Sequence, residues 1–198
     1  MTDLAGFRTR ILALLGDPAG ARYTNATLDE ALSQALEEFS VTVPNLIIEE
    51  FTVVTTGREQ LITTVPSFLN VLQVVYPYNG TATEQTLLDA FYAWHDGEYL
   101  ALYIGSPAVP AAGEVIQIYY TIPHTVENLN SAVATTINPA HDGLLSQGAS
   151  AFSALLRAAQ MVETPGKRLE DTTNLQKWGQ EQRSHFTSSL RLLANGHT

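Results

Sequence analysis

Hydrophobic and polar positions recur with two different periods along the chain, and these periods divide it into three blocks. In the first block, residues 1–45, the hydrophobic positions have helical spacing. One stripe consists of Leu4, Phe7, Ile11, Leu14 and Leu15, and a second of Leu28, Ala31, Leu32, Ala35, Leu36 and Phe39. The pattern predicts a helix that ends at Gly16 and a second helix over residues 25–39. Thr2 or Asp3 can cap the first helix, and Thr24 the second.

The second block, residues 46–125, is rich in β-branched and aromatic residues. Turn residues divide it into six candidate strands, at residues 47–55, 60–64, 71–78, 86–94, 99–104 and 114–122. Asp96-Gly97 between alternating aromatic residues is the strongest hairpin signal in the chain. Ile116, Ile118, Tyr120 and Ile122 share one face of the last strand. These features predict a small antiparallel sheet or a small sandwich.

The third block, residues 126–198, returns to helical spacing after a loop. Asn138-Pro139 is typical of a helix start, and a long helix is expected from there to residue 162. A last helix is expected over residues 173–193. Glycine inside a helix is unfavourable by about 1 kcal/mol relative to alanine. Gly148 therefore marks either a close approach of another helix or a tolerated weak position.

The order of the blocks predicts the α+β class, with a helical bundle formed by the N- and C-terminal helices and an inserted antiparallel β-region. The expected parts are the N-terminal helices at residues 1–45, the insert at 46–125 and the C-terminal helices at 126–198. Because both crossings between bundle and insert are short, we expect one structural unit with a protruding sheet.

Composition and charge exclude several functions. The chain has 198 residues, no cysteine and a formal charge of -10. It can form neither a disulfide nor a thiolate metal site. Residues 59–156 contain eight acids and no lysine or arginine, whereas residues 157–198 contain six basic residues and four acids. A middle region without cations cannot grip phosphates. No export signal and no membrane-spanning segment is expected.

The sequence contains no motif that indicates catalysis, so we expect no enzyme activity, no cofactor and no metal. His124, His141 and Asp142 could be imagined as a metal site, but their spacing matches no regular ligand pattern. A serine paired with His141 or His185 lacks a nucleophile-elbow sequence. The aromatic residues of the second block are expected mainly in the core, with the remainder in an interface.

The order of motifs resembles that of the head-to-tail connector, or adaptor, proteins of tailed bacteriophages. The resemblance includes Arg22-Tyr23-Thr24, Ile118-Tyr119-Tyr120-Thr121, Thr135-Thr136-Ile137-Asn138-Pro139, the Gly148-Ala149 helix with Arg157-Ala158, and a closing amphipathic helix. It covers nearly the whole chain, although the β-region is larger than is usual in that family. The resemblance implies a ring of about a dozen subunits beneath the portal. The implied partners are further copies of the chain, the portal protein and a stopper or tail-completion protein, in the neck of a virion assembled in the host cytoplasm.

Two sets of residues are expected to act in such a ring. The basic residues Lys177, Arg183 and Arg191 are expected to dock on the portal. The acidic residues Glu84, Asp89, Glu98 and Glu114 are expected to face the channel, through which DNA passes without specific binding. The alternative is a carbohydrate-binding or adhesion module that uses the tyrosines and Trp94 of the β-region as a platform.

Overall fold

A computed structural model describes residues 2–65, 68–78, 80, 87–88, 90–97, 99–105, 109–162 and 169–195. It contains helices and antiparallel sheets, as the α+β prediction requires, and that prediction is confirmed. The chain divides into two compact units. The helical unit comprises Met1–Val43 and His124–Thr198, and the β unit comprises Pro44–Pro123. Whether the two behave as one structural unit stays a prediction.

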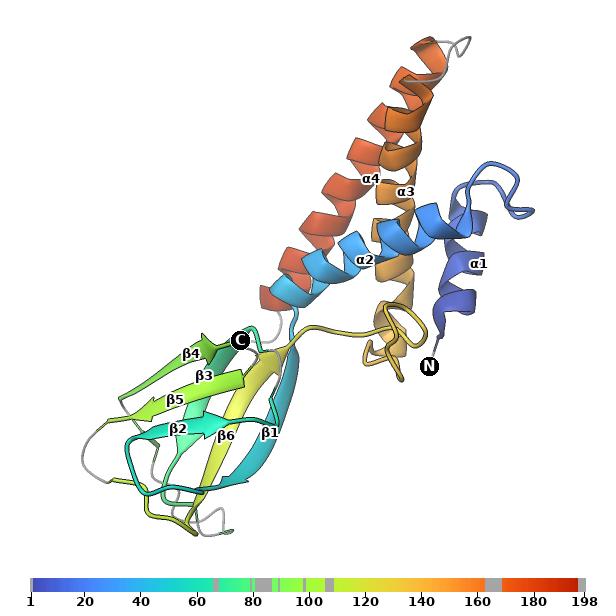
Figure 1. Cartoon of the computed structure of the whole chain (residues 1–198). Coiled ribbons are helices and arrows are strands. Elements are labelled where there is room, and N and C mark those ends of the chain that lie inside the picture. The colour runs from blue at the N-terminus through green and yellow to red at the C-terminus, as the bar shows by residue number, and fades with distance from the viewer. Residues whose placement is uncertain are drawn as a thin grey trace. The chain divides into compact units, whose positions relative to one another are not determined.

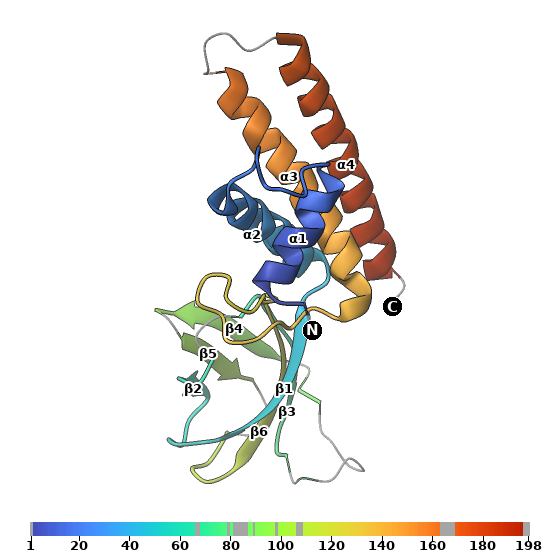
Figure 2. The same cartoon turned by 90° about the vertical axis from the view of Figure 1, so that its right-hand side faces the viewer.

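The helical unit is built around α3. The helices are α1 (Leu4–Leu14), α2 (Asn25–Thr42), α3 (Asp142–Val162) and α4 (Leu169–Asn195), and a 3-10 turn, η2 (Pro139–His141), precedes α3. The helix α4 packs along α3, and α1 and α2 also contact α3 (Figures 1 and 2). Buried side chains from all four helices form one core, which includes Phe7, Leu32, Phe39, Leu145 and Phe186.

The local signals at the helix ends are confirmed. The Asp3 side chain accepts a hydrogen bond from the Gly6 N–H and caps α1. Gly16 has a φ of 63°, and the next N–H, of Asp17, donates to the Leu12 carbonyl, which closes the helix end. The Thr24 hydroxyl accepts from the Thr27 N–H and caps α2.

Gly148 lies at a close approach of two helices, which decides between its two interpretations. A Cβ atom at this position would lie 2.8 Å from ring atoms of Phe186 in α4. The Phe186 ring is fully buried. Only a residue without a side chain fits between α3 and this ring.

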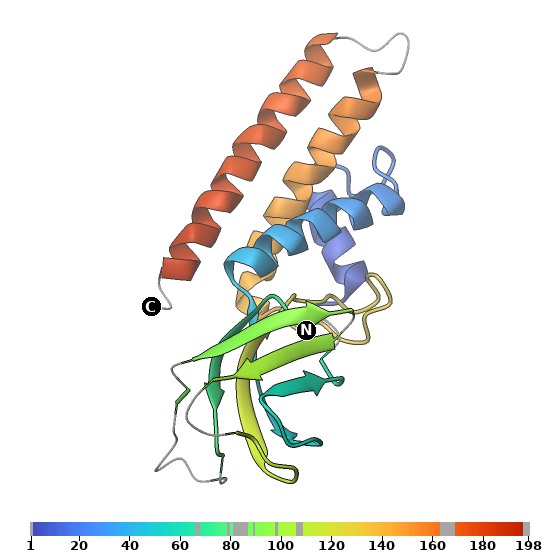
Figure 3. The same ribbon diagram turned by 60° about the vertical axis from the view of Figure 1, so that its left-hand side comes forward.

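The β unit consists of two three-stranded antiparallel sheets that face each other (Figure 3). One sheet has the order β1-β6-β3 and the other β2-β5-β4. Their bounds are β1 (Asn45–Thr52), β2 (Glu59–Ile62), β3 (Asn70–Val75), β4 (Phe91–Asp96), β5 (Tyr99–Ile104) and β6 (Val115–Ile122). The expected inner face of β6 is confirmed, since Ile116, Ile118 and Tyr120 are buried in the core between the sheets.

The fourth strand differs from its prediction. It was expected at residues 86–94, with His95 and Asp96 in the turn, but β4 extends to Asp96. The reason is that the His95 ring stacks on Phe68 at 4.0 Å between ring centroids, which keeps His95 in the strand. The turn begins at Gly97, whose φ of 64° favours glycine.

Candidate interaction surfaces

The exposed side of α4 carries a row of polar and basic residues. Lys177, Ser184 and Arg191 are separated by seven residues each, so they share one side of the helix. Gln180 and Ser188 lie between them, and we call these five residues the basic face. All residues of this face except Lys177 line a groove of about 510 Å³. The groove is lined by Glu38, Leu155, Gln180, Arg183, Ser184, Thr187, Ser188 and Arg191.

The three basic residues expected to dock on the portal have different surroundings. Arg183 lies 3.4 Å from the Glu38 carboxylate, and its guanidinium lies over the Phe152 ring at 4.9 Å. The Thr187 hydroxyl donates to the same carboxylate at 2.5 Å. Arg183 therefore also ties α4 to α2 and α3. Lys177 and Arg191 are exposed, and neither forms an ion pair with another described residue.

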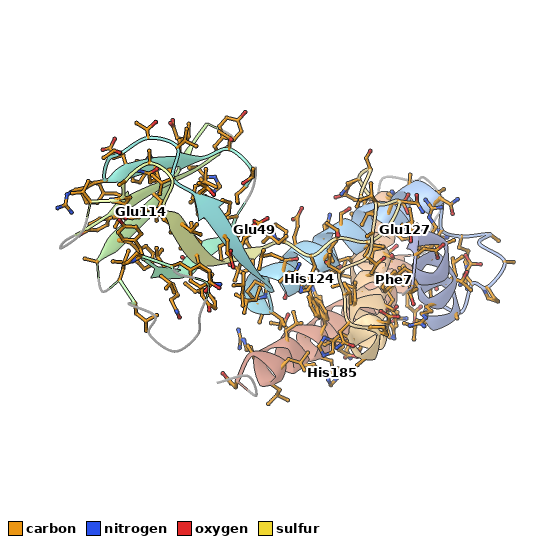
Figure 4. All side chains as sticks on the ribbon, turned by 90° about the horizontal axis from the view of Figure 1, so that it is seen from below. Phe7, Glu49, Glu114, His124, Glu127 and His185 are labelled. Atoms are coloured by element: carbon orange, nitrogen blue, oxygen red, sulfur yellow. The ribbon has the colours of Figure 1, made fainter. Side chains whose placement is uncertain are left out.

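Of the four acidic residues expected to face a channel, Glu84, Asp89 and Glu98 lie outside the described residues. Glu114 immediately precedes β6 and is labelled in Figure 4. Its carboxylate accepts hydrogen bonds from the Tyr76 hydroxyl and from the Ala111 N–H, the latter at 2.7 Å. The Tyr76 hydrogen bond is the main cause that lowers the Glu114 pKa. Burial, followed by this hydrogen bond, raises the pKa of Tyr76 to about 12. These hydrogen bonds hold the Glu114 side chain in place within the β unit, and the residue is exposed to solvent.

The outer face of the sheet β2-β5-β4 carries exposed aromatic side chains. Tyr92 and Trp94 of β4 are 70% and 42% exposed. The strand register places Tyr92 opposite Tyr103, and Trp94 opposite Ala101. Leu61 of β2 lies on the other side of Ala101 and is half exposed. The Tyr92 and Trp94 side chains do not belong to the expected aromatic core, and they are among the residues that the alternative prediction placed in an exposed platform.

The histidines of the helical unit pack against an aromatic ring. His124 and His141 contact Phe39, with centroid distances of 5.4 and 5.8 Å. Asp142 is 2% exposed, and its carboxylate instead accepts from the Thr2 hydroxyl at 2.5 Å and lies 3.2 Å from Arg10. Within the described residues, no group of three or more His, Cys, Asp or Glu side chains could hold a metal ion. No described helix is long and apolar enough to cross a membrane.

Comparison with known proteins gives a likeness to solved structures but none to a described family. No protein-family model matches the chain, and no curated protein matches it. Among solved structures, it is similar to a chain of the neck of an empty GTA particle computed with C6 symmetry. The identity is 15% and the TM-score 0.31, over 89% of this chain and 87% of that chain.

Proposed function

We propose that the chain is a structural head-to-tail connector of a tailed bacteriophage particle. In this proposal about a dozen copies form a ring under the portal, extend the DNA channel and dock a stopper or tail component. The ring is not an enzyme, occupies the neck of the virion and is assembled in the host cytoplasm. The resemblance in motif order supports this proposal, and so do the surfaces described above.

The unequal charge of the two units is the observation that carries the proposal. The β unit contains eight acids and one base, Arg58, whereas the helical unit contains twelve acids and nine bases. A surface almost without cations does not retain DNA phosphates, which suits a conduit. Glu114, with Glu84, Asp89 and Glu98, is assigned to the channel on this basis.

The basic face of α4 supports the assignment of portal docking to the helical unit. Lys177 and Arg191 are exposed at the two ends of this face. Exposed charges of one sign steer a partner with the opposite charge. We assign docking to Lys177 and Arg191 first, and to Arg183 where its pairing with Glu38 is exchanged for a partner carboxylate.

The test mixes the full chain with the portal protein of the same phage and examines the product by electron microscopy. We expect rings seated on the portal. Lys177→Gln combined with Arg191→Gln should weaken co-assembly by about tenfold, because two exposed cations are lost. The matched control lowers the net charge by the same amount at two α4 positions outside the basic face, with Gln176→Glu and His185→Glu. Absence of rings, or equal weakening by the control, would contradict the proposal.

The exposed aromatic face of the sheet favours a second candidate, a carbohydrate-binding or adhesion module. Tyr92 and Trp94 lie on the same face of the sheet, and Tyr103 lies beside Tyr92 at 6.3 Å between ring centroids. Exposed aromatic patches are typical of binding sites. A glycan array distinguishes the two functions, since binding that Tyr92→Ala and Trp94→Ala abolish would favour the module over the connector.

A further inference from the structure

The two sides of the β unit are closed to different degrees. On the side of β3 and β4, Val75 forms a β-bridge with Leu87, and the Leu88 N–H donates to the Val74 carbonyl at 3.0 Å. The Phe68 and His95 rings stack on the same side. On the opposite side, β1 and β2 are the end strands of their sheets. Within the described residues, neither has a partner strand at its outer edge.

With respect to the described residues, the outer edge of β1 presents unpaired backbone hydrogen-bonding groups. The Val53 N–H donates to the Glu114 carbonyl at 2.8 Å, and the Val53 carbonyl accepts from the Gly113 N–H at 2.9 Å. Both backbone groups of Val53 therefore point toward the β6 side. Because backbone direction alternates along an antiparallel strand, Ile47, Glu49 and Phe51 also point toward β6. The backbone groups of Ile48, Glu50 and Thr52 consequently point away from the sheet.

The outer edge of β2 has the same character. The Ile104 N–H donates to the Arg58 carbonyl at 2.8 Å, so Arg58 points toward β5. The same alternation leaves the backbone groups of Glu59 and Leu61 directed away from β5. Both sheets thus end in a row of groups that can pair with a further strand.

A cavity of about 690 Å³ lies between these two edges. It is lined by residues 49–55 and 59–64 and by Ile116 of β6. Backbone donors and acceptors, threonine hydroxyls and apolar side chains surround the same space. Such a lining fits an extended polypeptide better than a compact small molecule, since a strand satisfies backbone edges along its whole length.

One carboxylate of the cavity lining, that of Glu49, lies on the inner face of its sheet. The Glu49 carboxylate accepts a hydrogen bond from the Tyr120 hydroxyl at 2.6 Å, and Glu49 is an exposed residue of the cavity lining. Figure 4 labels Glu49 on the β unit. Glu50 and Glu59 also border the cavity, but strand alternation directs their side chains to the outer faces of the two sheets, where Glu50 forms a hydrogen bond with Tyr78. Arg58, the one base of the β unit, donates to the Ile104 carbonyl at 3.3 Å. The charge of this lining is complementary to a cationic strand.

A second copy of the chain is a poor occupant of the same edge. Two copies paired through β1 would bring their glutamates together, and like charges at an edge oppose edge-to-edge pairing. Charged residues directed inward on an edge strand have this protective effect in many sheets. The opening therefore disfavours a second copy of the chain and favours a partner strand that carries lysine or arginine.

We propose that the opening between β1 and β2 accepts an extended, lysine- or arginine-bearing strand of another polypeptide. The strand pairs with the outer edge of β1 and places a cation against Glu49. The inference does not depend on the connector function, because it rests on the strand edges, the cavity and the charge of the β unit.

Hydrogen exchange of the full chain tests this pairing residue by residue. The probe is a blocked peptide of alternating valine and lysine, and the control peptide has glutamate in place of lysine. The lysine peptide should slow exchange of the Ile48, Glu50 and Thr52 amides by about tenfold or more. The Ile47, Glu49 and Phe51 amides, which already face β6, should change little. No slowing, or equal slowing by both peptides, would overturn the proposal.

Two variants test separately the backbone pairing at the β1 edge and the charge of Glu49. Ile48→Pro removes an outward N–H and leaves the hydrogen bonds to β6 in place, so it should abolish peptide binding. Protection of the Ile47 and Phe51 amides shows whether this variant is folded. Glu49→Gln should weaken binding by about tenfold, since it removes the charge facing the cation. Glu127→Gln, an exposed change in the helical unit, is the matched control and should have no effect. Slowed exchange that appears on raising the protein concentration alone would identify a second copy as the occupant and overturn the proposal.

Discussion

The helical unit and the β unit bury their hydrophobic side chains in different ways. In the helical unit, α3 presents small residues that let other helices approach, and Gly148 lies directly against the Phe186 ring. In the β unit, a core of branched side chains fills the space between two sheets, but the side between β1 and β2 stays open. A tightly packed core in one unit can thus coexist, in the same chain, with strand edges whose backbone groups are unpaired in the other unit. It also suggests where each unit is vulnerable.

The strongest test of the comparison is to disrupt one core and observe both units. Phe186→Ala removes a fully buried ring from the helical core, which should lower the stability of that unit by about 4 kcal/mol. The two cores consist of separate sets of residues, so the β unit should keep its own transition. The two tryptophans of the chain, Trp94 in β4 and Trp178 in α4, report on one unit each when the other is replaced by phenylalanine.

Urea unfolding followed by fluorescence provides the measurement. A shift of the Trp178 transition alone is the expected result. Equal shifts of the Trp94 and Trp178 transitions would show instead that the chain is one cooperative unit, as the short crossings between the blocks predict.

A smaller loss is expected from filling the close approach between α3 and α4. Gly148→Leu should destabilise the helical unit by about 3 kcal/mol, because the added side chain collides with the buried Phe186 ring. Gly143→Ala is the matched control, since a Cβ there meets no atom within 4 Å. The control should be neutral or stabilising by up to about 1 kcal/mol. Thermal unfolding of both variants gives the comparison, and a tolerated leucine would mean that the helices are less tightly packed.

High pH should affect the β unit through its buried tyrosines. Burial and the Glu114 hydrogen bond raise the pKa of Tyr76 from 10.0 to about 12, and burial with the Glu49 hydrogen bond also raises the pKa of Tyr120. Between pH 10 and 12 the unfolded chain releases the Tyr76 proton and the folded chain retains it. The stability reported by Trp94 should therefore fall as the pH rises through this range. Tyr76→Phe should make the decrease shallower, and an unchanged slope would exclude Tyr76 as its cause.

The smallest effect is expected in the helical unit at mildly acidic pH. Burial against Phe39, with repulsion from His141, lowers the His124 pKa below 6.5. Stability that depends on neutral His124 is present above pH 6.5 and is lost as the pH falls through the lowered pKa. The Trp178 transition should shift accordingly, and His124→Gln should remove the shift. His185→Gln, at an exposed position of α4, should leave it in place.

Local signals in the sequence predicted most of the helical unit and part of the β unit. The Asp3 and Thr24 caps, the turn at Gly16 and the inner face of β6 depend on near neighbours and on period, and all are confirmed. The end of β4 depends on the contact between His95 and Phe68, residues far apart in the sequence. No local pattern reveals such a contact, and the prediction there was wrong.

The candidate surfaces were less predictable for the same reason. The seven-residue spacing of Lys177, Ser184 and Arg191 is visible in the sequence, whereas the pairing of Arg183 with Glu38 is not. The exposed aromatic face and the free edge of β1 follow from strand order and register, which depend on long-range pairing. The assignment of Lys177 and Arg191 to docking, and of Glu114 to a channel, stays a prediction.

The antiparallel pairing of β1 with β6 has a consequence for how such a chain can evolve. Asn45 lies opposite Ile122, so the β unit begins and ends on adjacent strands, about 5 Å apart. A gene could therefore lose, enlarge or exchange residues 44–123 while a short turn rejoined the flanking helices. Selection can then change the β unit while the helical unit keeps its sequence.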